Sequence, residues 1–272
     1  MPVERIGFCT WAKCRRVTAW SDWQGGRATM ALLECVRLVK EYGEKLALDN
    51  VDFHVEQGEL VALVGREGAG KTTAYGLVCG LLSPTSGRVR LNGIDVTDWM
   101  PGQRERLGIR FVPQDASVYQ KITAEDALLA APQSLEMNVK QRRSQVDELL
   151  FQFGLDWRRN EIVGSLSFGE QMRLAIAKCL VGNPSLLLLD EPFEATDVVT
   201  THGIESILSE LPTKGISVLL TDNRGLQVLP LAHRTYVLRD GKVIASGNAV
   251  AVLGILNARR AYFGDKGFPK LF

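Results

Sequence analysis

The stretch "GREGAGKTT", residues 65 to 73, decides the fold. It fits the pattern G-x-x-x-x-G-K-[ST], and it stands between the apolar run "LVALV" and a segment that we predict to be helical over residues 72 to 82. Glycines let main-chain N–H groups curl around a phosphate, and the N-terminus of the following helix adds partial positive charge. The stretch therefore predicts a phosphate-binding loop in an α/β fold.

This phosphate loop, residues 65 to 73, supplies two side chains with specific expected roles. Lys71 is expected to reach the β and γ oxygens of a nucleotide, and the Thr72 hydroxyl is expected to bind Mg²⁺. An ordinary glycine-rich turn with an exposed lysine is the alternative, which the flanking strand and helix disfavour. The other expected nucleotide-binding positions of the loop are Gly65, Arg66, Glu67, Gly68, Ala69, Gly70 and Thr73.

A pair of acids ends the apolar run "LLLL" of residues 186 to 189. These are Asp190 and Glu191. A nucleotide hydrolase needs one carboxylate that holds Mg²⁺ through water and another that orients the attacking water. Two acids can also simply cap a strand end, but the upstream phosphate loop favours the catalytic interpretation. We assign the metal to Asp190 and the water to Glu191.

The segment "LSFGEQ", residues 166 to 171, is predicted to begin a helix. Ser167 and Glu170 form the S-x-x-E pattern of a capping box, in which two side chains satisfy the first main-chain N–H groups. In isolation this pattern indicates an ordinary helix cap. Its place between the phosphate loop and the Asp190 strand suggests a further role in nucleotide binding.

Composition excludes several classes of protein. The chain has 272 residues, 46% of them hydrophobic, and 32 basic against 31 acidic residues give a net charge of +1. This balance provides no field for holding nucleic acid or an anionic membrane, so neither is an expected partner. Its apolar runs are shorter than the ~18 residues of a membrane span. The spacing of Cys9, Cys14, Cys35, Cys79 and Cys179 indicates neither a zinc site nor a disulfide framework.

The order of patterns along the chain predicts the domain organisation. Residues 1–29 lack regular periodicity and form an atypical extension, either disordered or lying upstream of a translation start at Met30. Asn92-Gly93 predicts a type I′ hairpin turn. Helical spacing of apolar residues from Val146 to Phe153 predicts a helical subdomain over about residues 115–165. Strands are expected at residues 33 to 39, 51 to 55, 60 to 64, 185 to 190, 215 to 222 and 234 to 247.

Together, these motifs in residues 31–265 resemble the ATP-binding cassette (ABC) ATPases, with a tail at 266–272. The resemblance implies a phosphate-loop NTPase of the ABC type: a mainly parallel core sheet, an antiparallel β subdomain and a helical subdomain. It implies ATP and Mg²⁺ as cofactors. It also implies that Ser167, Gly169 and Glu170 grip the γ-phosphate bound to a second cassette, so that two copies, expected to be a homodimer, complete two sites.

The resemblance assigns three further residues. Tyr42 matches the aromatic residue that stacks on adenine, although a tyrosine at a strand end can also belong to the core. Gln114, in "FVPQDAS", matches a catalytic glutamine that contacts Mg²⁺ and links the site to the helical subdomain. Asp197, in "FEATD", matches the aspartate that crosses to the partner cassette.

Within the family, "VPQDASVYQKITAEDAL", "LLLLDEPF" and "AYFGDKGF" most resemble the ATP-binding subunit of the lipopolysaccharide exporter. ATPases of branched-chain amino acid importers are the alternative, because they share a similar ending. The resemblance implies an integral membrane permease as partner, contacted through Tyr119, and a position on the cytoplasmic face of the inner membrane.

Three positions depart from the family pattern: Phe168 replaces a glycine, Val198 replaces a proline, and Asn223 replaces the switch histidine that bonds to the γ-phosphate. Asparagine has a donor N–H, but its side chain is shorter and always neutral. Loss of one transition-state donor typically costs about 2.7 to 4 kcal/mol. We therefore expect ATP binding with slow hydrolysis. A binding module in which ATP acts mainly as a clamp is the alternative. We do not expect any other histidine, or the nearest cation, to take the place of a histidine at 223. These residues are His54, His202, His233 and Arg224.

Overall fold

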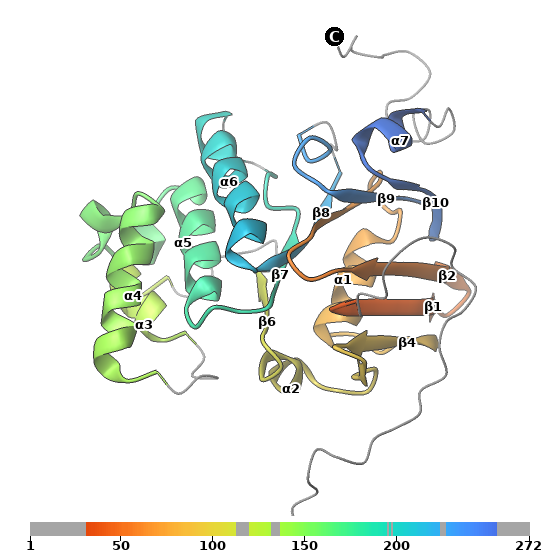
Figure 1. Ribbon diagram of the computed structural model, residues 1–272, viewed down its shortest axis with the longest axis horizontal. Coiled ribbons are helices and arrows are strands. Elements are labelled where there is room, and N and C mark those ends of the chain that lie inside the picture. The colour runs from red at the N-terminus through yellow and green to blue at the C-terminus, as the bar shows by residue number, and fades with distance from the viewer. Residues whose placement is uncertain are drawn as a thin grey trace, which may run out of the picture.

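The computed structural model of the protein describes residues 31–112, 120–131, 137–194, 196, 198–223 and 227–254. Two sheets organise these residues (Figure 1). A six-stranded sheet has the order β10-β9-β3-β8-β7-β6, and a four-stranded sheet has the order β2-β1-β4-β5. The predicted combination of a mainly parallel core sheet, an antiparallel β unit and a helical unit is confirmed.

The six-stranded sheet is parallel except at one edge. Its parallel strands are β6 (Ile109–Val112), β7 (Leu186–Asp190), β8 (Ser217–Asp222), β3 (Leu60–Val64) and β9 (Arg234–Arg239), and β10 (Lys242–Gly247) pairs antiparallel with β9. Every residue of β3, β7 and β8 is buried, as expected for parallel strands covered on both faces. Ligands of such sheets bind beyond the carboxyl ends of the strands.

The four-stranded sheet is antiparallel throughout. It consists of β1 (Leu33–Tyr42), β2 (Lys45–Val55), β4 (Ser86–Leu91) and β5 (Ile94–Asp95). The turn between β4 and β5 has positive φ at both central residues, 48° at Asn92 and 77° at Gly93. Both values are required by the type I′ turn that the sequence predicts.

Helix α1 (Lys71–Cys79) follows the phosphate loop and packs between the two sheets. It ends three residues before the predicted boundary because Gly80 adopts φ 79°, and the N–H groups of Leu81 and Leu82 both bond to the Gly76 carbonyl. Arg104 of α2 (Pro101–Glu105) is buried against this end and donates to the Leu77 and Val78 carbonyls at 2.6 and 2.7 Å. Its charge suits the negative end of the helix dipole.

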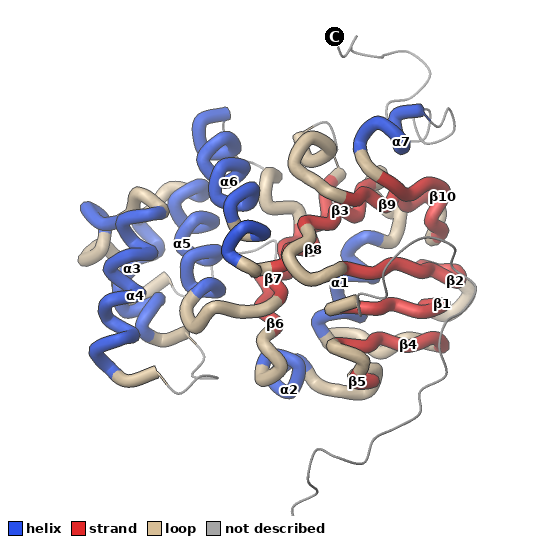
Figure 2. Tube along the Cα trace, viewed as in Figure 1, coloured by secondary structure: helices blue, strands red, loops and turns tan. Residues whose placement is uncertain are grey.

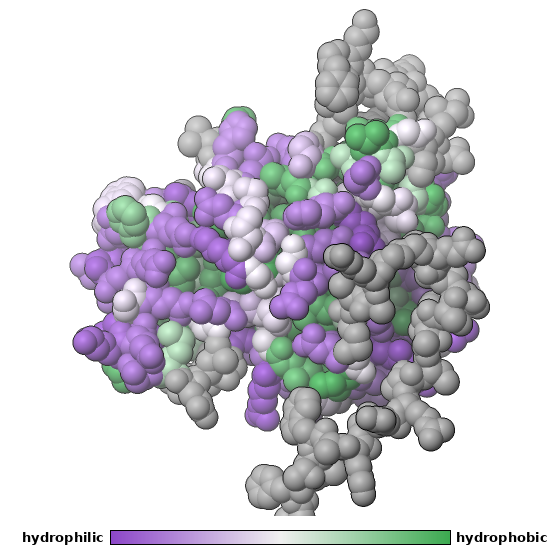
Figure 3. Space-filling model, viewed as in Figure 1, coloured by the Kyte–Doolittle hydropathy of each residue, from purple (hydrophilic) through white to green (hydrophobic). Residues whose placement is uncertain are grey.

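Helices cover the other face of the parallel sheet, on the left of Figure 1. In Figure 2 they form a layer beside the strands, and in Figure 3 the outer surface of α3 to α5 is mostly hydrophilic. None of the helices in the described ranges combines the length and hydrophobicity needed to cross a bilayer. The helices of this side and the short connecting helices are α3 (Ala124–Leu129), α4 (Val139–Gln152), η2 (Asp156–Arg158), η3 (Val163–Ser165), α5 (Phe168–Leu180), α6 (Val198–Glu210) and η4 (Pro212–Lys214). Helix α7 (Ala249–Gly254) lies apart from them, against β9 and β10.

Candidate functional site

The phosphate loop joins β3 to α1, and two of its glycines are tightly packed against neighbouring main-chain atoms. Gly70 has φ 104°, and a Cβ there would lie 2.7 Å from the Ala47 carbonyl oxygen. A Cβ on Gly65 would lie 2.4 Å from the Leu238 carbonyl oxygen, so a side chain fits at neither position. Gly70 precedes α1 and makes no side-chain cap, so the start of this helix suits an anion that accepts from first-turn N–H groups.

Lys71, the first residue of α1, is almost fully buried. Its ammonium group lies 3.2 Å from Glu191 Oε1 and donates to the Arg66 carbonyl oxygen at 3.2 Å. A buried ammonium group requires a nearby negative charge, which Glu191 provides. The loop lysine and the second predicted carboxylate are therefore in direct contact.

The two acidic residues lie at the carboxyl end of β7, and both bond to the Thr221 hydroxyl, Asp190 through its carboxylate and Glu191 through its main chain. The Thr221 hydroxyl donates to Asp190 Oδ1 and accepts from the Glu191 main-chain N–H at 3.0 Å. Glu191 has φ 48°, which turns it away from the strand direction. Burial raises the pKa of Asp190, and the Thr221 bond and Lys71 only partly oppose this. Burial likewise raises the pKa of Glu191, and Lys71 opposes it.

Asn223 lies beside Glu191, at the end of the neighbouring strand β8. Its Nδ2 donates to Glu191 Oε2 at 3.2 Å, so the two carboxylate oxygens of Glu191 have different partners, Lys71 and Asn223. The amide bonds to the carboxylate, and this contact could not be read from the sequence around residue 223. Lys71, Asp190, Glu191, Thr221 and Asn223 form one group, which we call the β-edge cluster.

The three histidines of the chain lie outside the β-edge cluster, as expected. His233 Nδ1 accepts from the Leu60 N–H, at the amino end of β3 and so at the opposite edge of the sheet. His54 contacts Tyr236, with 3.1 Å between its Nδ1 and the phenol oxygen. His202 is exposed on α6. Arg224 lies outside the described residues.

The candidate metal ligands supply oxygen atoms, the donor type that Mg²⁺ prefers. Thr72 is exposed in the first turn of α1 next to Lys71, and Asp190 is in the β-edge cluster. Gln114 lies outside the described residues. Within the described part of the chain, no three His, Cys, Asp or Glu side chains are grouped to hold a metal by themselves. The oxygen donors of Thr72 and Asp190 fit Mg²⁺, whose remaining ligands phosphate oxygens and water can supply.

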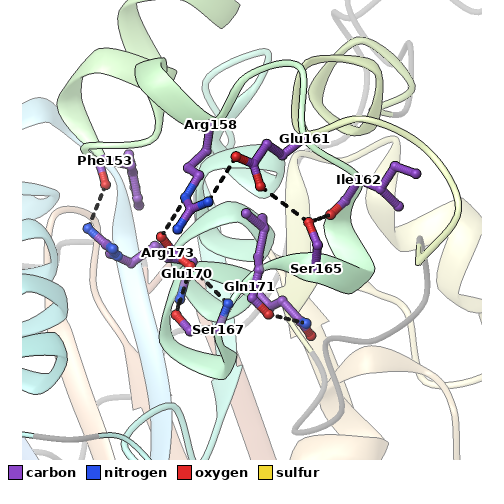
Figure 4. Close-up of polar contacts among 10 residues, drawn as sticks. Phe153, Arg158, Glu161, Ile162, Ser165, Ser167, Glu170, Gln171 and Arg173 are labelled. Carbon is purple, nitrogen blue, oxygen red and sulfur yellow. Dashed lines mark hydrogen bonds and ion pairs between the residues drawn. The ribbon is translucent and has the colours of Figure 1, made fainter.

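The signature segment, residues 166–171, begins α5 with the predicted capping box. Glu170 Oε2 accepts from the Ser167 N–H at 2.8 Å and from its hydroxyl at 2.9 Å, while Ser167 Oγ accepts from the Glu170 N–H at 3.3 Å (Figure 4). A Cβ on Gly169 would lie 2.5 Å from Thr200 Cγ2, so this glycine lets α5 approach α6 closely. Phe168 is 41% exposed and is not part of the core.

Tyr42 is at the end of β1 and is 47% exposed, with Lys40 Nζ 5.2 Å from its ring centroid. The core alternative for this tyrosine is therefore wrong. The predicted residues Gln114, Tyr119 and Asp197 lie outside the described residues, as do segments 1–29 and 266–272.

Two residues with contacts in these sites were not anticipated from the sequence. Thr221 is a polar residue inside the apolar run before Asn223, which is a weak signal, and its pairing with Asp190 depends on strand register. Arg158 bonds to Glu170 of the signature segment at 3.3 Å, across a separation of twelve residues. No local pattern indicates this second contact.

The model of the ABC transporter family matches residues 48–194. This chain belongs to that family. Members of the family are ATPases whose cassettes dimerise and work with membrane permeases, so the predicted family, fold and enzyme class are confirmed.

Three relatives illustrate the similarity. The cassette is 35% identical over 249 residues to a probable ABC transporter ATP-binding protein of Azorhizobium caulinodans, covering 90% of this chain and 89% of the relative. It is 33% identical to LptB of the Haemophilus influenzae lipopolysaccharide export system, over 87% of this chain and 99% of LptB. A dimeric ATP-binding cassette with ADP and Pi, in a post-hydrolysis state, superposes with TM-score 0.71 and 28% identity over 80% of this chain and 98% of that one.

Proposed function

We propose that this cassette is the ATP-hydrolysing subunit of a lipopolysaccharide exporter. The single observation that carries the catalytic part is the β-edge cluster, in which Lys71 of the phosphate loop meets the Glu191 carboxylate at 3.2 Å. In this proposal Lys71 and the loop N–H groups hold the triphosphate. Thr72, Asp190 and Gln114 would hold Mg²⁺, which would supply positive charge to the phosphate oxygens when bound.

Glu191 then orients the attacking water. Burial supports this role because a carboxylate with a raised pKa is a better proton acceptor than an exposed one. Asn223 restrains the same carboxylate from the β8 side. When the lysine ammonium binds phosphate oxygens, its bond to Glu191 weakens, and Asn223 becomes the main restraint left within the cluster.

Two cassettes complete each nucleotide site in this proposal. The support is the dimeric relative, which holds ADP and Pi, and the capped signature segment, in which Ser167 and Phe168 are exposed. Ser167 and Gly169 would meet the γ-phosphate held by the second copy, and Asp197 would cross the interface. Tyr42, exposed at the end of β1, would stack on adenine.

The nucleotide part is tested with Mg-ATP and purified protein. Lys71→Ala should abolish measurable Mg-ATP binding, whereas Glu191→Gln should bind ATP, dimerise and hydrolyse very slowly. Circular dichroism would show that both variants are folded. Unchanged ATP affinity in folded Lys71→Ala would refute the assignment of the phosphate loop.

The cargo assignment is supported by the alignment with LptB, which spans 99% of that relative. The expected partner is a permease on the cytoplasmic face of the inner membrane, contacted through Tyr119. Co-purification of the native protein in mild detergent, followed by mass spectrometry, tests this. Recovery of a lipopolysaccharide-type permease is expected, and recovery of an amino acid importer permease would reverse the assignment.

A second candidate is a cassette in which ATP acts mainly as a clamp between two copies. Asn223, which is neutral and bonds to Glu191 in the described structure, favours this candidate. It predicts ATP-dependent dimers with almost no steady-state hydrolysis, even in the presence of the permease.

A further inference from the structure

The signature segment is connected to the helical region by one arginine. Arg158, the last residue of η2, donates from Nε to Glu170 Oε1 at 3.3 Å and from Nη1 to Glu161 Oε1 at 2.8 Å (Figure 4). The Trp157 ring covers its guanidinium group, with 3.9 Å between Arg158 Cζ and the ring centroid. The arginine is therefore held on one face by an aromatic ring and at its edge by two carboxylates.

Glu170 uses both carboxylate oxygens. Oε2 holds the N–H and hydroxyl of Ser167, while Oε1 faces Arg158. The glutamate side chain is only 12% exposed. Burial raises the pKa of Glu170, but the bonds from Ser167 and Arg158 together lower it below its ordinary value, so the carboxylate stays ionised.

An ionised carboxylate at this place opposes the expected ligand. The Ser167 hydroxyl has one proton, which here goes to Glu170 and would be needed by an incoming phosphate oxygen. The negative charge of Glu170 would also repel a triphosphate approaching the start of α5. A cation bonded to the far oxygen reduces both effects, because it offsets the charge and makes the carboxylate a weaker acceptor.

We propose that Arg158 is a positioning residue that offsets the charge of Glu170 and so allows Ser167 to bind the γ-phosphate held by a second copy of this chain. The inference rests on the proposed function. It assigns to one arginine of the helical region a part in closing the nucleotide site between two cassettes.

The neighbouring residue provides a matched control. Arg159 also pairs with two carboxylates, at 3.2 Å from Glu125 Oε2 and in a close contact with Asp147, but these belong to α3 and α4. Arg158 and Arg159 thus make similar ion pairs on different partners. Only the former touches the signature segment.

The test measures Mg-ATP-dependent dimerisation of full-length Glu191→Gln protein by analytical ultracentrifugation. Adding Arg158→Gln should raise the dimer dissociation constant about tenfold. Loss of a partly exposed ion pair changes an equilibrium constant roughly threefold per site. The symmetric dimer contains two such sites, so the effect on its dissociation constant is squared. Adding Arg159→Gln should leave the constant within about twofold. Mg-ATP binding to each monomer should stay unchanged, because the phosphate loop is intact.

Two further variants separate a charge effect from a packing effect. Arg158→Gln combined with Glu170→Gln should restore dimerisation, because glutamine preserves the capping box and removes the charge that Arg158 offsets. Arg158→Lys, which keeps the charge, should dimerise within about threefold of the parent. The Arg158→Gln defect should also shrink at 0.5 M salt, where the Debye length falls to about 4 Å.

The outcomes distinguish this inference from the proposed function. If Glu191→Gln does not dimerise with Mg-ATP, the proposed two-copy site fails and this inference fails with it. If the parent dimerises and folded Arg158→Gln dimerises equally well, only the role of Arg158 is overturned. A defect that Glu170→Gln does not relieve would also overturn it. If Arg158→Gln does not fold, the lysine and double variants decide, and loss of dimerisation in both refutes the charge argument.

Discussion

Replacing Asn223 by alanine removes the Nδ2 donor 3.2 Å from Glu191 Oε2 without changing the backbone. The Glu191 side chain is 12% exposed, so water replaces the lost bond only in part. A hydrogen bond to a charged group contributes about 1.5 to 3 kcal/mol. If this restraint is needed when water attacks, the rate should fall roughly 10- to 150-fold, because each 1.36 kcal/mol changes a rate tenfold.

The assay is steady-state ATP hydrolysis at saturating Mg-ATP, together with equilibrium binding of a fluorescent ATP analogue. We expect kcat to fall and the binding constant to change less than twofold, because the loop that holds the phosphates does not include residue 223. Asn248→Ala is a matched control, since that asparagine caps α7 through a bond from the Ala251 N–H, away from the β-edge cluster.

A double-mutant cycle shows whether Asn223 acts through Glu191 or directly on phosphate. If it acts through Glu191, Asn223→Ala should have little further effect in Glu191→Gln, because the carboxylate that it restrains is already gone. If it contacts phosphate directly, the two losses should multiply. Multiplicative losses would refute our interpretation of this contact.

Asn223→His tests the expectation that hydrolysis is slow. A histidine is longer than asparagine and can be cationic next to phosphate. One added transition-state donor can raise the rate by roughly 10²-fold. If histidine gives no gain in a folded protein that binds ATP normally, the native site is already complete and the slow-turnover hypothesis is wrong.

Three further predictions follow from the contacts of the two sites. Thr221→Val should destabilise the fold by about 1 to 3 kcal/mol in chemical denaturation, because the buried Asp190 carboxylate loses its donor; a change below 0.5 kcal/mol would contradict this. Since burial raises the folded pKa of Asp190, stability falls as pH rises through that pKa, so Asp190→Asn should raise the thermal midpoint at pH 7 but not below pH 4; equal midpoints at pH 7 would contradict this. Gly169→Ala should cost about 1 to 3 kcal/mol, because its Cβ would lie 2.5 Å from Thr200 Cγ2, and Thr200→Ala should relieve the cost in the double variant; full stability of Gly169→Ala would show that α6 yields easily.

Much of the fold follows from local sequence patterns. Strand β3 was predicted at residues 60 to 64 and has those bounds, because an uninterrupted apolar run before a glycine-rich loop has few alternatives. The turn at Asn92-Gly93 is equally local. The predicted helix after the loop was too long, because Leu81 and Leu82 continue the apolar pattern while Gly80 has already ended the helix with a positive φ. The apolar pattern and the glycine are conflicting signals, and the residue types alone do not show which of them sets the end of the helix.

The contacts that restrain the catalytic carboxylate come from pairing between distant strands. Thr221 lies opposite Asp190 only because β7 and β8 pair in parallel in one register, and the same register brings Asn223 to Glu191. A shift of one residue would turn the side chains of β8 to the other face and remove the threonine hydroxyl from both acids. By contrast, the phosphate loop is one continuous segment whose N–H groups need no such pairing. Hydrolysis by this cassette therefore depends on the register of two strands, whereas phosphate binding depends mainly on the conformation of a single loop.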